Sequence, residues 1–454
     1  MGGFEAAKLV EAAQFELSIA LFTTASPLEP FPRGIMLRFD LSLAENLHSE
    51  HLSFMSNFYN ADPDLCYLDG NSLGRLPLAA MQRVVTLVRE GWGEDLIRGW
   101  NKDWIDLPIR LGDKIARLIG ASEGEVVIAD STSINLFKLA TAALQLKSGR
   151  SKVVTDATNF PSDLYILESA ASSAGNAQQL HAVGSAADVE APVEELLKAI
   201  DQDTALVSLS HVAFRSAAMW DMDRVTQAAH AAGALVLWDL SHSVGAIPVE
   251  LNRCQADLAV GCTYKYLCGG PGAPAFLYVR KNLQSTLQNP LQGWFSHRSP
   301  FEFGPQYEPA ETIERFLVGT PPILSLAAIE AGVDLVSQSG IAELRKKSIE
   351  LSEVLISLFD RDLSELGFQL QSPTSAASRG SHISISHPEA RRITQVLIDR
   401  FQVIPDFRGP DIIRIGIAPL YNTQQDIRKV ASAMREIVLD KLYLSARIDD
   451  SPVT

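Results

Sequence analysis

Two apolar, strand-like runs near the middle of the chain each end at an ionisable side chain. The first run, residues 234–239, ends on Asp239, with His242 three residues later, and the second ends at Tyr264 and Lys265. A lysine amine can form a Schiff base with an aldehyde, and a carboxylate can keep a pyridine nitrogen protonated so that its ring accepts electrons. Asp239 and Lys265 are therefore candidates for binding pyridoxal phosphate. Charged residues at strand ends are also common in α/β folds, so these two alone leave both interpretations open.

Hydroxyl groups at an expected helix start could hold the phosphate of such a cofactor. Thr132 and Ser133 follow the strand-like run 126–130 and begin a helical pattern. Free N–H groups and the helix dipole at such a start bind phosphate, and hydroxyls add donors. Serine and threonine are also standard helix caps, which is an equally good explanation.

The FPSD run at 160–163 has the same ambiguity. Ser162 or Asp163 could cap the helix that begins there. Phe160 could instead lie flat on a cofactor ring and exclude water from one of its faces. Pro161, between them, belongs to the same candidate loop.

The order of the elements predicts the fold that positions these residues. From residue 126 to about 276, strand-like runs alternate with helical ones, which indicates a mostly parallel sheet with helices on both faces. Helices are expected earlier, at about 78–92 and around Leu111 to Ile119. A long helical stretch at 324–359, broken near Gly340, precedes short strands and two further helices at about 388–401 and 423–442. We predict an α/β fold with a smaller α+β domain.

These patterns divide the chain into four parts: an extension of unknown structure (1–35), a segment joining the small domain (36–70), a large cofactor-binding α/β domain (71–323), and a linking helix with the small C-terminal domain (324–454). The apolar run at 17–28 is short and lacks a basic start, so a secretory signal is not expected. Met36 could be a natural start.

Composition narrows the class of protein. Of 454 residues, 46% are hydrophobic and 20% charged, as in soluble globular proteins. The net charge of −15 argues against nucleic acid or an anionic membrane as the main partner. No run approaches the ~20 apolar residues of a membrane span. The four cysteines lack metal-ligand spacing, and we expect buried thiols in a reducing cytoplasm.

The motifs together resemble the kynureninase family, pyridoxal-phosphate enzymes of fold type I and the class V aminotransferase-like group. The likeness extends over about 39–442. It is carried by GNSLG at 70–74, TSINL at 132–136, FPSD at 160–163, WDLSHS at 238–243, TYK at 263–265, GWFSH at 293–297, GTPPI at 319–323 and IRIGIAPLYN at 413–422.

The resemblance implies a role for each matched position. Lys265 would carry the cofactor, Asp239 would pair with its pyridinium nitrogen, and Arg414 would grip the substrate α-carboxylate through its planar guanidinium. Further cofactor contacts are expected from Thr132, Ser133, Phe160, Pro161, Ser162, Asp163, Ser210, His242, Tyr264, Trp294 and Thr320. Further substrate contacts are expected from Ser72, Trp100 and Trp104. A core or interface position is the commoner role for such tryptophans.

The family resemblance also implies a reaction and an assembly. The reaction is hydrolysis of kynurenine to anthranilate and alanine in tryptophan catabolism, with Lys265 taking the Cα proton and Tyr264 as a candidate acid/base in later steps. The protein would be a cytoplasmic homodimer in which Trp294 and Thr320 reach the neighbouring subunit's site. Thr320 stands where some relatives have asparagine, which leaves the choice between kynurenine and its 3-hydroxy form open.

Three other functions compete with this one. A small-substrate aminotransferase would use the same lysine, aspartate and arginine. A cysteine desulfurase or selenocysteine lyase would need a nucleophilic cysteine in the second half, and no cysteine follows Cys268. A non-catalytic binding protein that retained the fold would be colourless when purified.

Overall fold

The computed structural model describes residues 54–174 and 179–446, which belong to one compact unit that begins at Leu52. The predicted extension 1–35 and the apolar run at 17–28 lie outside the described residues. Of the predicted segment 36–70, the structure describes residues 54–70. Within the described ranges, no helix combines the length and apolar character that a membrane crossing requires.

A seven-stranded sheet forms the centre of the larger part of the fold. Its strand order is β2-β8-β7-β6-β5-β3-β4, and β8 alone runs antiparallel to its neighbours. The strands are β2 (Val126–Ile128), β3 (Lys152–Asp156), β4 (Gln179–Val183), β5 (Thr204–Ser210), β6 (Leu235–Asp239), β7 (Leu258–Gly261) and β8 (Phe276–Val279). The predicted mostly parallel sheet is confirmed.

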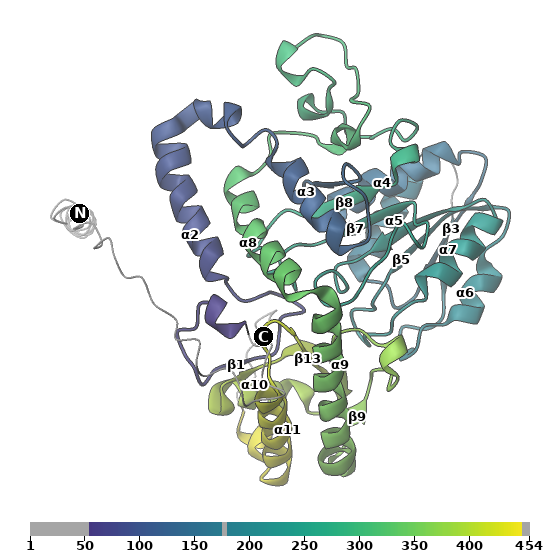
Figure 1. Cartoon of the computed structure of the whole chain (residues 1–454). Helices are drawn as coiled ribbons and strands as arrows, with labels where there is room; N and C mark the ends of the chain where they lie inside the picture. Colours follow the sequence, from purple (N-terminus) through teal and green to yellow (C-terminus); the bar gives the residue numbers. More distant parts are fainter. Residues whose placement is uncertain (1–53, 175–178, 447–454) are drawn as a thin grey trace, which may run out of the picture. The chain divides into compact units, whose positions relative to one another are not determined.

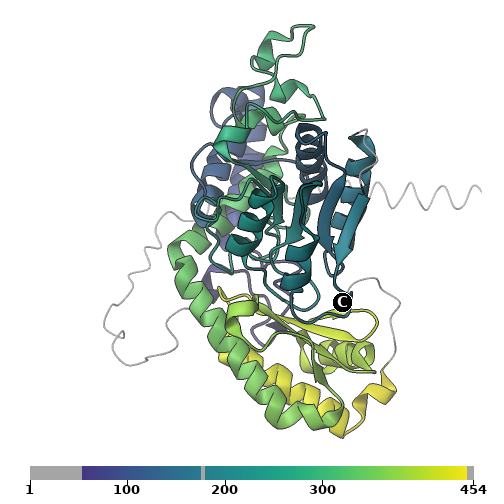
Figure 2. The ribbon, with the colours of Figure 1, turned by 90° about the vertical axis from the view of Figure 1, so that its right-hand side faces the viewer.

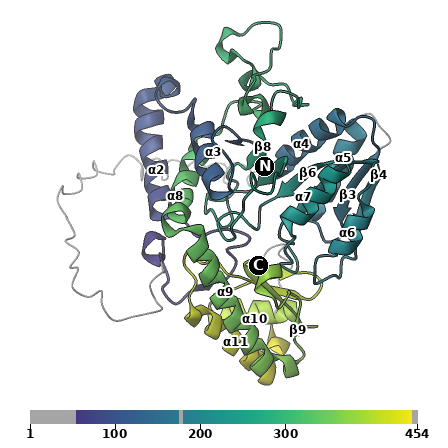
Figure 3. The same ribbon diagram turned by 45° about the vertical axis from the view of Figure 1, so that its right-hand side comes forward.

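Helices cover both faces of this sheet, which explains why its inner strands read as continuous apolar runs. Alternate strand residues enter two separate cores: Val207 and Trp238 on one face, Leu206 and Leu237 on the other. On the first face pack α3 (Leu107–Leu118), α6 (Val193–Ala199) and α7 (Met222–Ala231). On the other pack α4 (Thr132–Leu146) and α5 (Pro161–Ser173), and the labels in Figure 3 locate both groups.

A four-stranded antiparallel sheet forms the smaller part, in the order β12-β13-β10-β9. Its strands are β9 (Gln369–Leu370), β10 (His382–Ser386), β12 (Asp406–Arg408) and β13 (Ile412–Gly416). Isoleucines on one face pack against α9 (Ile341–Leu358), α10 (Ala390–Phe401) and α11 (Gln424–Leu439). Figure 2 shows these strands between the C-terminal helices and the larger part.

The opposite face of the small sheet is polar and contacts the larger part. Arg414 Nη1 donates a hydrogen bond to the backbone oxygen of Phe214 at 2.5 Å, and Ser384 Oγ donates one to the oxygen of Arg215. Two-residue strands β1 (Cys66–Tyr67) and β11 (Val403–Ile404) pair in parallel nearby. The two sheets are therefore joined through polar contacts, and these lie beside the candidate site.

One long helical connection links the two parts, as predicted. It consists of α8 (Ile323–Ser339) and α9, separated at Gly340, whose φ of +76° breaks the helix. Figure 1 shows α8 running beside α2 (Leu78–Thr86) before α9 reaches the small sheet. The four cysteines are free and buried, as expected from the sequence.

Several elements differ from the prediction. The helix expected at 78–92 is α-helical only to Thr86 and continues as a π-helix at Leu87–Asp95. Sequence patterns gave no sign of β4, which is an edge strand with mostly exposed or half-exposed residues and so lacks an apolar run. The short strands β1, β11 and β12 contain too few residues to show a period of two.

Candidate active site

Polar side chains from both parts of the fold converge on a pocket of about 190 Å³ beyond the carboxyl ends of β5 and β6. This is where α/β sheets place their ligands. Its lining residues are Asn71, Ser72, Thr132, Ser133, Phe160, Asp163, Ser210, Phe214, Asp239, Ser241, His242, Tyr264, Lys265, Arg408 and Arg414. Eleven positions expected from the sequence are among them; Asn71, Phe214, Ser241 and Arg408 were not expected.

Asp239 is the last residue of β6 and is held by hydrogen bonds at the inner end of the pocket. Its Oδ1 accepts bonds from the N–H of Ser241 at 2.9 Å and from its hydroxyl at 2.6 Å. Ser210 Oγ lies 3.5 Å from Oδ2. Burial raises the pKa of Asp239, although Ser241 and the charge of Lys265 act in the opposite direction. A buried carboxylate of this kind is stabilised by a cationic partner, such as a protonated ring nitrogen.

Lys265 follows β7 and shares the pocket with Asp239. Its Nζ lies 6.0 Å from the centre of the Tyr264 ring. Tyr264 is partly buried, which raises the pKa of its phenol and keeps the hydroxyl protonated at neutral pH. The pocket thus contains an amine for covalent attachment and a neutral proton donor next to it in sequence.

Two helix N-termini meet at one side of the pocket. Ser131 is the N-cap of α4, so Thr132 and Ser133 are not needed for capping, and both line the pocket. No side chain caps α5, although Ser162 lies in its first turn. Ser133 Oγ and Ser162 Oγ are 3.1 Å apart and join the two helix starts. Two positive dipole ends with hydroxyl donors make an anion site, which suits the phosphate of the cofactor.

Phe160 and Asp163 lie on the α5 side of the pocket. Phe160 is 42% exposed, and its ring packs edge-on against Phe214 with centroids 5.3 Å apart. Asp163 is buried, and its pKa is raised well above the usual range by burial first and by the charge of Asp239 second. The burial and the neighbouring charge of Asp239 thus favour the protonated form of the Asp163 carboxyl.

His242 lies beside a second buried histidine, His382. The two ring centroids are 5.4 Å apart, and His382 comes from β10 of the small sheet. Burial holds the pKa of His242 well below its usual range, and the charge of Lys265 lowers it further. His242 is therefore neutral and faces the pocket as a hydrogen-bonding group.

Arg414 lies on β13, directly opposite Asp406 on β12. Its Nε and Nη2 both bond to Asp406 Oδ2, and Nη2 also donates to Ser72 Oγ at 3.2 Å. Its side chain is 2% exposed. The structure thus brings together Ser72 and Arg414, two of the four residues predicted for substrate binding, from segments 342 residues apart.

Six predicted site residues lie outside this pocket. Pro161 and Ser162 begin α5 beside it. Trp100, Trp104 and Thr320 line a separate hollow of about 410 Å³, and Trp294 packs against Phe295 with ring centroids 4.7 Å apart. A single chain therefore does not bring these tryptophans and Thr320 to the pocket, and their roles stay predictions.

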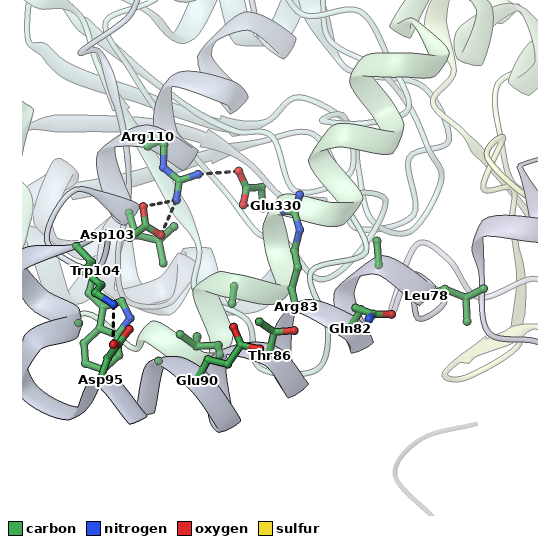
Figure 4. Close-up of a pocket in the computed structure, with 17 residues that line it drawn as sticks. Leu78, Gln82, Arg83, Thr86, Glu90, Asp95, Asp103, Trp104, Arg110 and Glu330 are labelled. Carbon is green, nitrogen blue, oxygen red and sulfur yellow. Dashed lines mark hydrogen bonds and ion pairs between the residues drawn. The ribbon is translucent and has the colours of Figure 1, made fainter. Parts of the chain in front are cut away.

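A wider hollow of about 730 Å³ lies between α2, α3 and α8 (Figure 4). Its charged groups are paired with one another: Arg110 bonds to Glu330 at 2.7 Å and to Asp103 at 2.8 Å, and Arg83 bonds to Glu330 at 2.7 Å. Its lysine, Lys102, is 63% exposed and is paired with Asp95 at 2.6 Å, so it differs from Lys265, which shares its pocket with the buried carboxylate of Asp239. Size alone therefore does not identify the site.

Comparison with known proteins gives one consistent family. The profile of the kynureninase C-terminal domain family matches residues 344–434. The chain is 46% identical to the kynureninase of Pseudomonas fluorescens, over 84% of this chain and 91% of that protein. It is 44% identical to the kynureninase of Burkholderia pseudomallei strain 1106a, over 82% and 89%.

Solved structures share the fold at lower identity. A cysteine desulfurase from Thermococcus onnurineus NA1 superposes with a TM-score of 0.72 at 18% identity, covering 83% of this chain and 95% of that one. A C-DES mutant with glycine covalently linked to its PLP cofactor gives 0.69 at 19% identity, covering 82% and 97%. At this identity the likeness concerns the fold alone, and it confirms the predicted fold type.

Proposed function

The chain belongs to the kynureninase family, and we propose that the pocket lined by Asp239, Lys265 and Arg414 is where it carries out that family's reaction. The reaction is the hydrolysis of L-kynurenine to anthranilate and L-alanine, with pyridoxal phosphate as cofactor. The observation that supports the placement best is that an amine and a buried carboxylate from successive strand ends line one pocket, opposite an arginine.

Bound in this pocket, pyridoxal phosphate supplies an aldehyde that joins an amine covalently and a ring that accepts electrons. Lys265 Nζ would be the amine for attachment, and the buried carboxylate of Asp239 would pair with the ring nitrogen. The α4 and α5 starts, with Thr132 and Ser133, hold the phosphate.

Two residues of this chain carry protons in the proposed reaction. With the cofactor and substrate bound, Lys265 Nζ would be the base that takes the proton from the substrate Cα. Tyr264 Oη is protonated at neutral pH and serves as the acid in a later step. Tyr264→Phe should keep the cofactor bound but slow product formation, and unchanged turnover would exclude this role.

The substrate end of the pocket is assigned to Arg414 and Ser72. A planar guanidinium is suited to a carboxylate, and its rigid attachment to Asp406 fixes the position of the α-carboxylate. In a site shared between two copies of the chain, Thr320 would supply a hydroxyl for the aromatic end of the substrate. We therefore assign kynurenine as substrate, with 3-hydroxykynurenine as an alternative to be tested by comparing kcat/KM for the two.

A homodimer with shared sites is part of the same proposal. Along α2 and the π-helix, large apolar side chains are exposed at spacings of three and four residues: Leu78, Met81, Val85, Val88 and Trp92. Such a stripe indicates a helix face that another protein surface covers. Thr320 and Trp294 are also exposed, so a second copy could receive them at its pocket.

Mixing two inactive variants tests the shared site. In a mixed dimer of Lys265→Ala and Trp294→Ala chains, one of the two sites would contain an intact lysine and the neighbour's intact tryptophan. Activity should therefore return on mixing, up to about a quarter of the wild-type value for random exchange, because half of the dimers are mixed and half of their sites are complete. No recovery in dimers shown to have exchanged subunits would exclude sharing.

An aminotransferase is separated from this function by its products. Wild-type protein should release anthranilate and alanine from kynurenine without a keto-acid acceptor, and Lys265→Ala should not. Dependence on an added keto acid would favour the aminotransferase instead. A cytoplasmic location is proposed with this function, because the four cysteines are free thiols.

A further inference from the structure

A second arginine, Arg408, lies beside Arg414 at the pocket wall. In the antiparallel pair β12–β13, Asp406 is opposite Arg414, and Arg408 is two residues from Asp406 on the same strand. Side chains two apart on a strand point to the same face. The register therefore places Asp406, Arg408 and Arg414 on one face of the small sheet, and both arginines line the pocket.

The two guanidinium groups converge on a single oxygen atom. Asp406 Oδ2 accepts a bond from Arg408 Nε at 3.1 Å and from both Nε and Nη2 of Arg414. All three nitrogens thus lie within hydrogen-bond distance of one atom. A carboxylate that approaches Arg414 from the pocket also approaches Arg408.

Arg414 has little hydrogen-bonding capacity left. Of the five N–H groups of an arginine, Arg414 directs two to Asp406, one to the oxygen of Phe214 and one to Ser72 Oγ. Within residues 54–174 and 179–446 this leaves one N–H on Nη1 for a ligand. A carboxylate needs at least two donors for bidentate capture, so Arg414 alone would have to give up Ser72 or Phe214.

Arg408 has the donors that Arg414 lacks. Within the same described ranges its one side-chain hydrogen bond is the Nε bond to Asp406, and both terminal nitrogens remain for a ligand. Its side chain is 41% exposed, compared with 2% for Arg414, so it is open to the pocket. A group that served only to neutralise Asp406 would be redundant, because Arg414 already bonds to the same oxygen twice.

We propose that Arg408 is a second binding residue for the substrate α-carboxylate, which it holds together with Nη1 of Arg414. This rests on the pocket being the active site, as proposed above. Charge supports it, because Arg414 is buried and bonds to Asp406 through two nitrogens, so its positive charge is largely offset before a carboxylate arrives. Arg408 brings positive charge nearer to the open side of the pocket, where a free amino acid enters.

Replacing Arg408 and varying the ligand tests the proposal. In Arg408→Gln, KM for kynurenine should rise about ten- to a hundredfold, the usual cost of losing a hydrogen bond between charged groups, while kcat changes little. The decarboxylated amine of kynurenine, used as a competitive inhibitor, should bind Arg408→Gln and wild type within about twofold of each other. Arg408→Lys keeps a positive charge but loses the planar guanidinium, so its KM for kynurenine should lie between those of the wild type and Arg408→Gln.

Matched controls separate this role from a structural one. Arg392 lies in the same part of the fold, is 37% exposed and pairs with Glu389 at 3.5 Å, so Arg392→Gln removes a comparable charge outside the pocket. It should leave KM unchanged. An unchanged KM in Arg408→Gln, or an equal loss of affinity for the carboxylate-free amine, would overturn the role of Arg408. If the wild type and Lys265→Ala gave equal product, the assignment of the pocket itself would fail instead.

Discussion

The hydroxyl of Ser241 favours the ionised form of the buried Asp239, and its removal should weaken cofactor binding. Ser241 Oγ donates to Asp239 Oδ1 at 2.6 Å in a buried site. A hydrogen bond to a charged group is worth about 1.5–3 kcal/mol, which corresponds to about one to two pKa units. Ser241→Ala should raise the pKa of Asp239 by that amount and the Kd of pyridoxal phosphate by about ten- to a hundredfold. Because the substitution raises the pKa of Asp239, the loss of cofactor affinity should become smaller as the pH increases and Asp239 ionises in the variant as well.

Titration of the apoprotein with pyridoxal phosphate, followed by the visible absorbance of the bound cofactor, measures this effect. Ser243→Ala is the matched control, because Ser243 Oγ is buried in the same segment but bonds to His211 Nδ1 at 2.8 Å, outside the pocket. Ser241→Ala also removes an acceptor for the N–H of Cys262, so the free energy of unfolding of each variant must be compared. In an Asp239→Asn background the Ser241 effect should vanish. Wild-type affinity in Ser241→Ala would refute the reasoning.

Two further predictions concern pH and packing. Burial, and next the charge of Asp406, raise the pKa of Asp69 to about 6, so lowering the pH through that value removes a negative charge beside the two arginines. KM for kynurenine should therefore rise with pH across this range in the wild type and stay flat in Asp69→Asn; the same pH dependence in both proteins would be contrary evidence. Gly332→Ala would place a methyl group 1.8 Å from the backbone oxygen of Leu267, and should destabilise the fold by about 1–3 kcal/mol or more, because neither backbone can move freely. Thermal unfolding measures this, with Gly149→Ala as a control that has no neighbour within 4 Å; equal Tm values would contradict the packing argument.

The sequence predicted the parallel sheet and the residues at its strand ends because both depend on local patterns. Apolar runs such as that of β6 identify buried strands, and a polar residue that follows one lies at the edge where ligands bind. Asp239 and Lys265 could be found in this way. The motif containing Ser241 was recognised, but the pattern does not reveal that its hydroxyl points back to Asp239.

Residues positioned by the small sheet were harder to predict. Arg408 lines the pocket only because a three-residue strand pairs in a particular register with β13, and so short a strand shows no period in the sequence. Asn71 is fully buried in a loop, and only the approach of Gly416 brings it to the site. Trp294 and Thr320 present a different difficulty, since their proposed position depends on a second copy of the chain.

Locating the covalent bond to the cofactor tests the central claim most directly. Borohydride reduction of the holoprotein should fix the cofactor on one lysine, and a modified Lys265 resists trypsin, so the labelled peptide should extend over 254–280. Mass spectrometry should find the added mass on Lys265 of that peptide and none in the Lys265→Ala protein. A label on another lysine, or no label on Lys265 in a protein that cleaves kynurenine, would contradict the account.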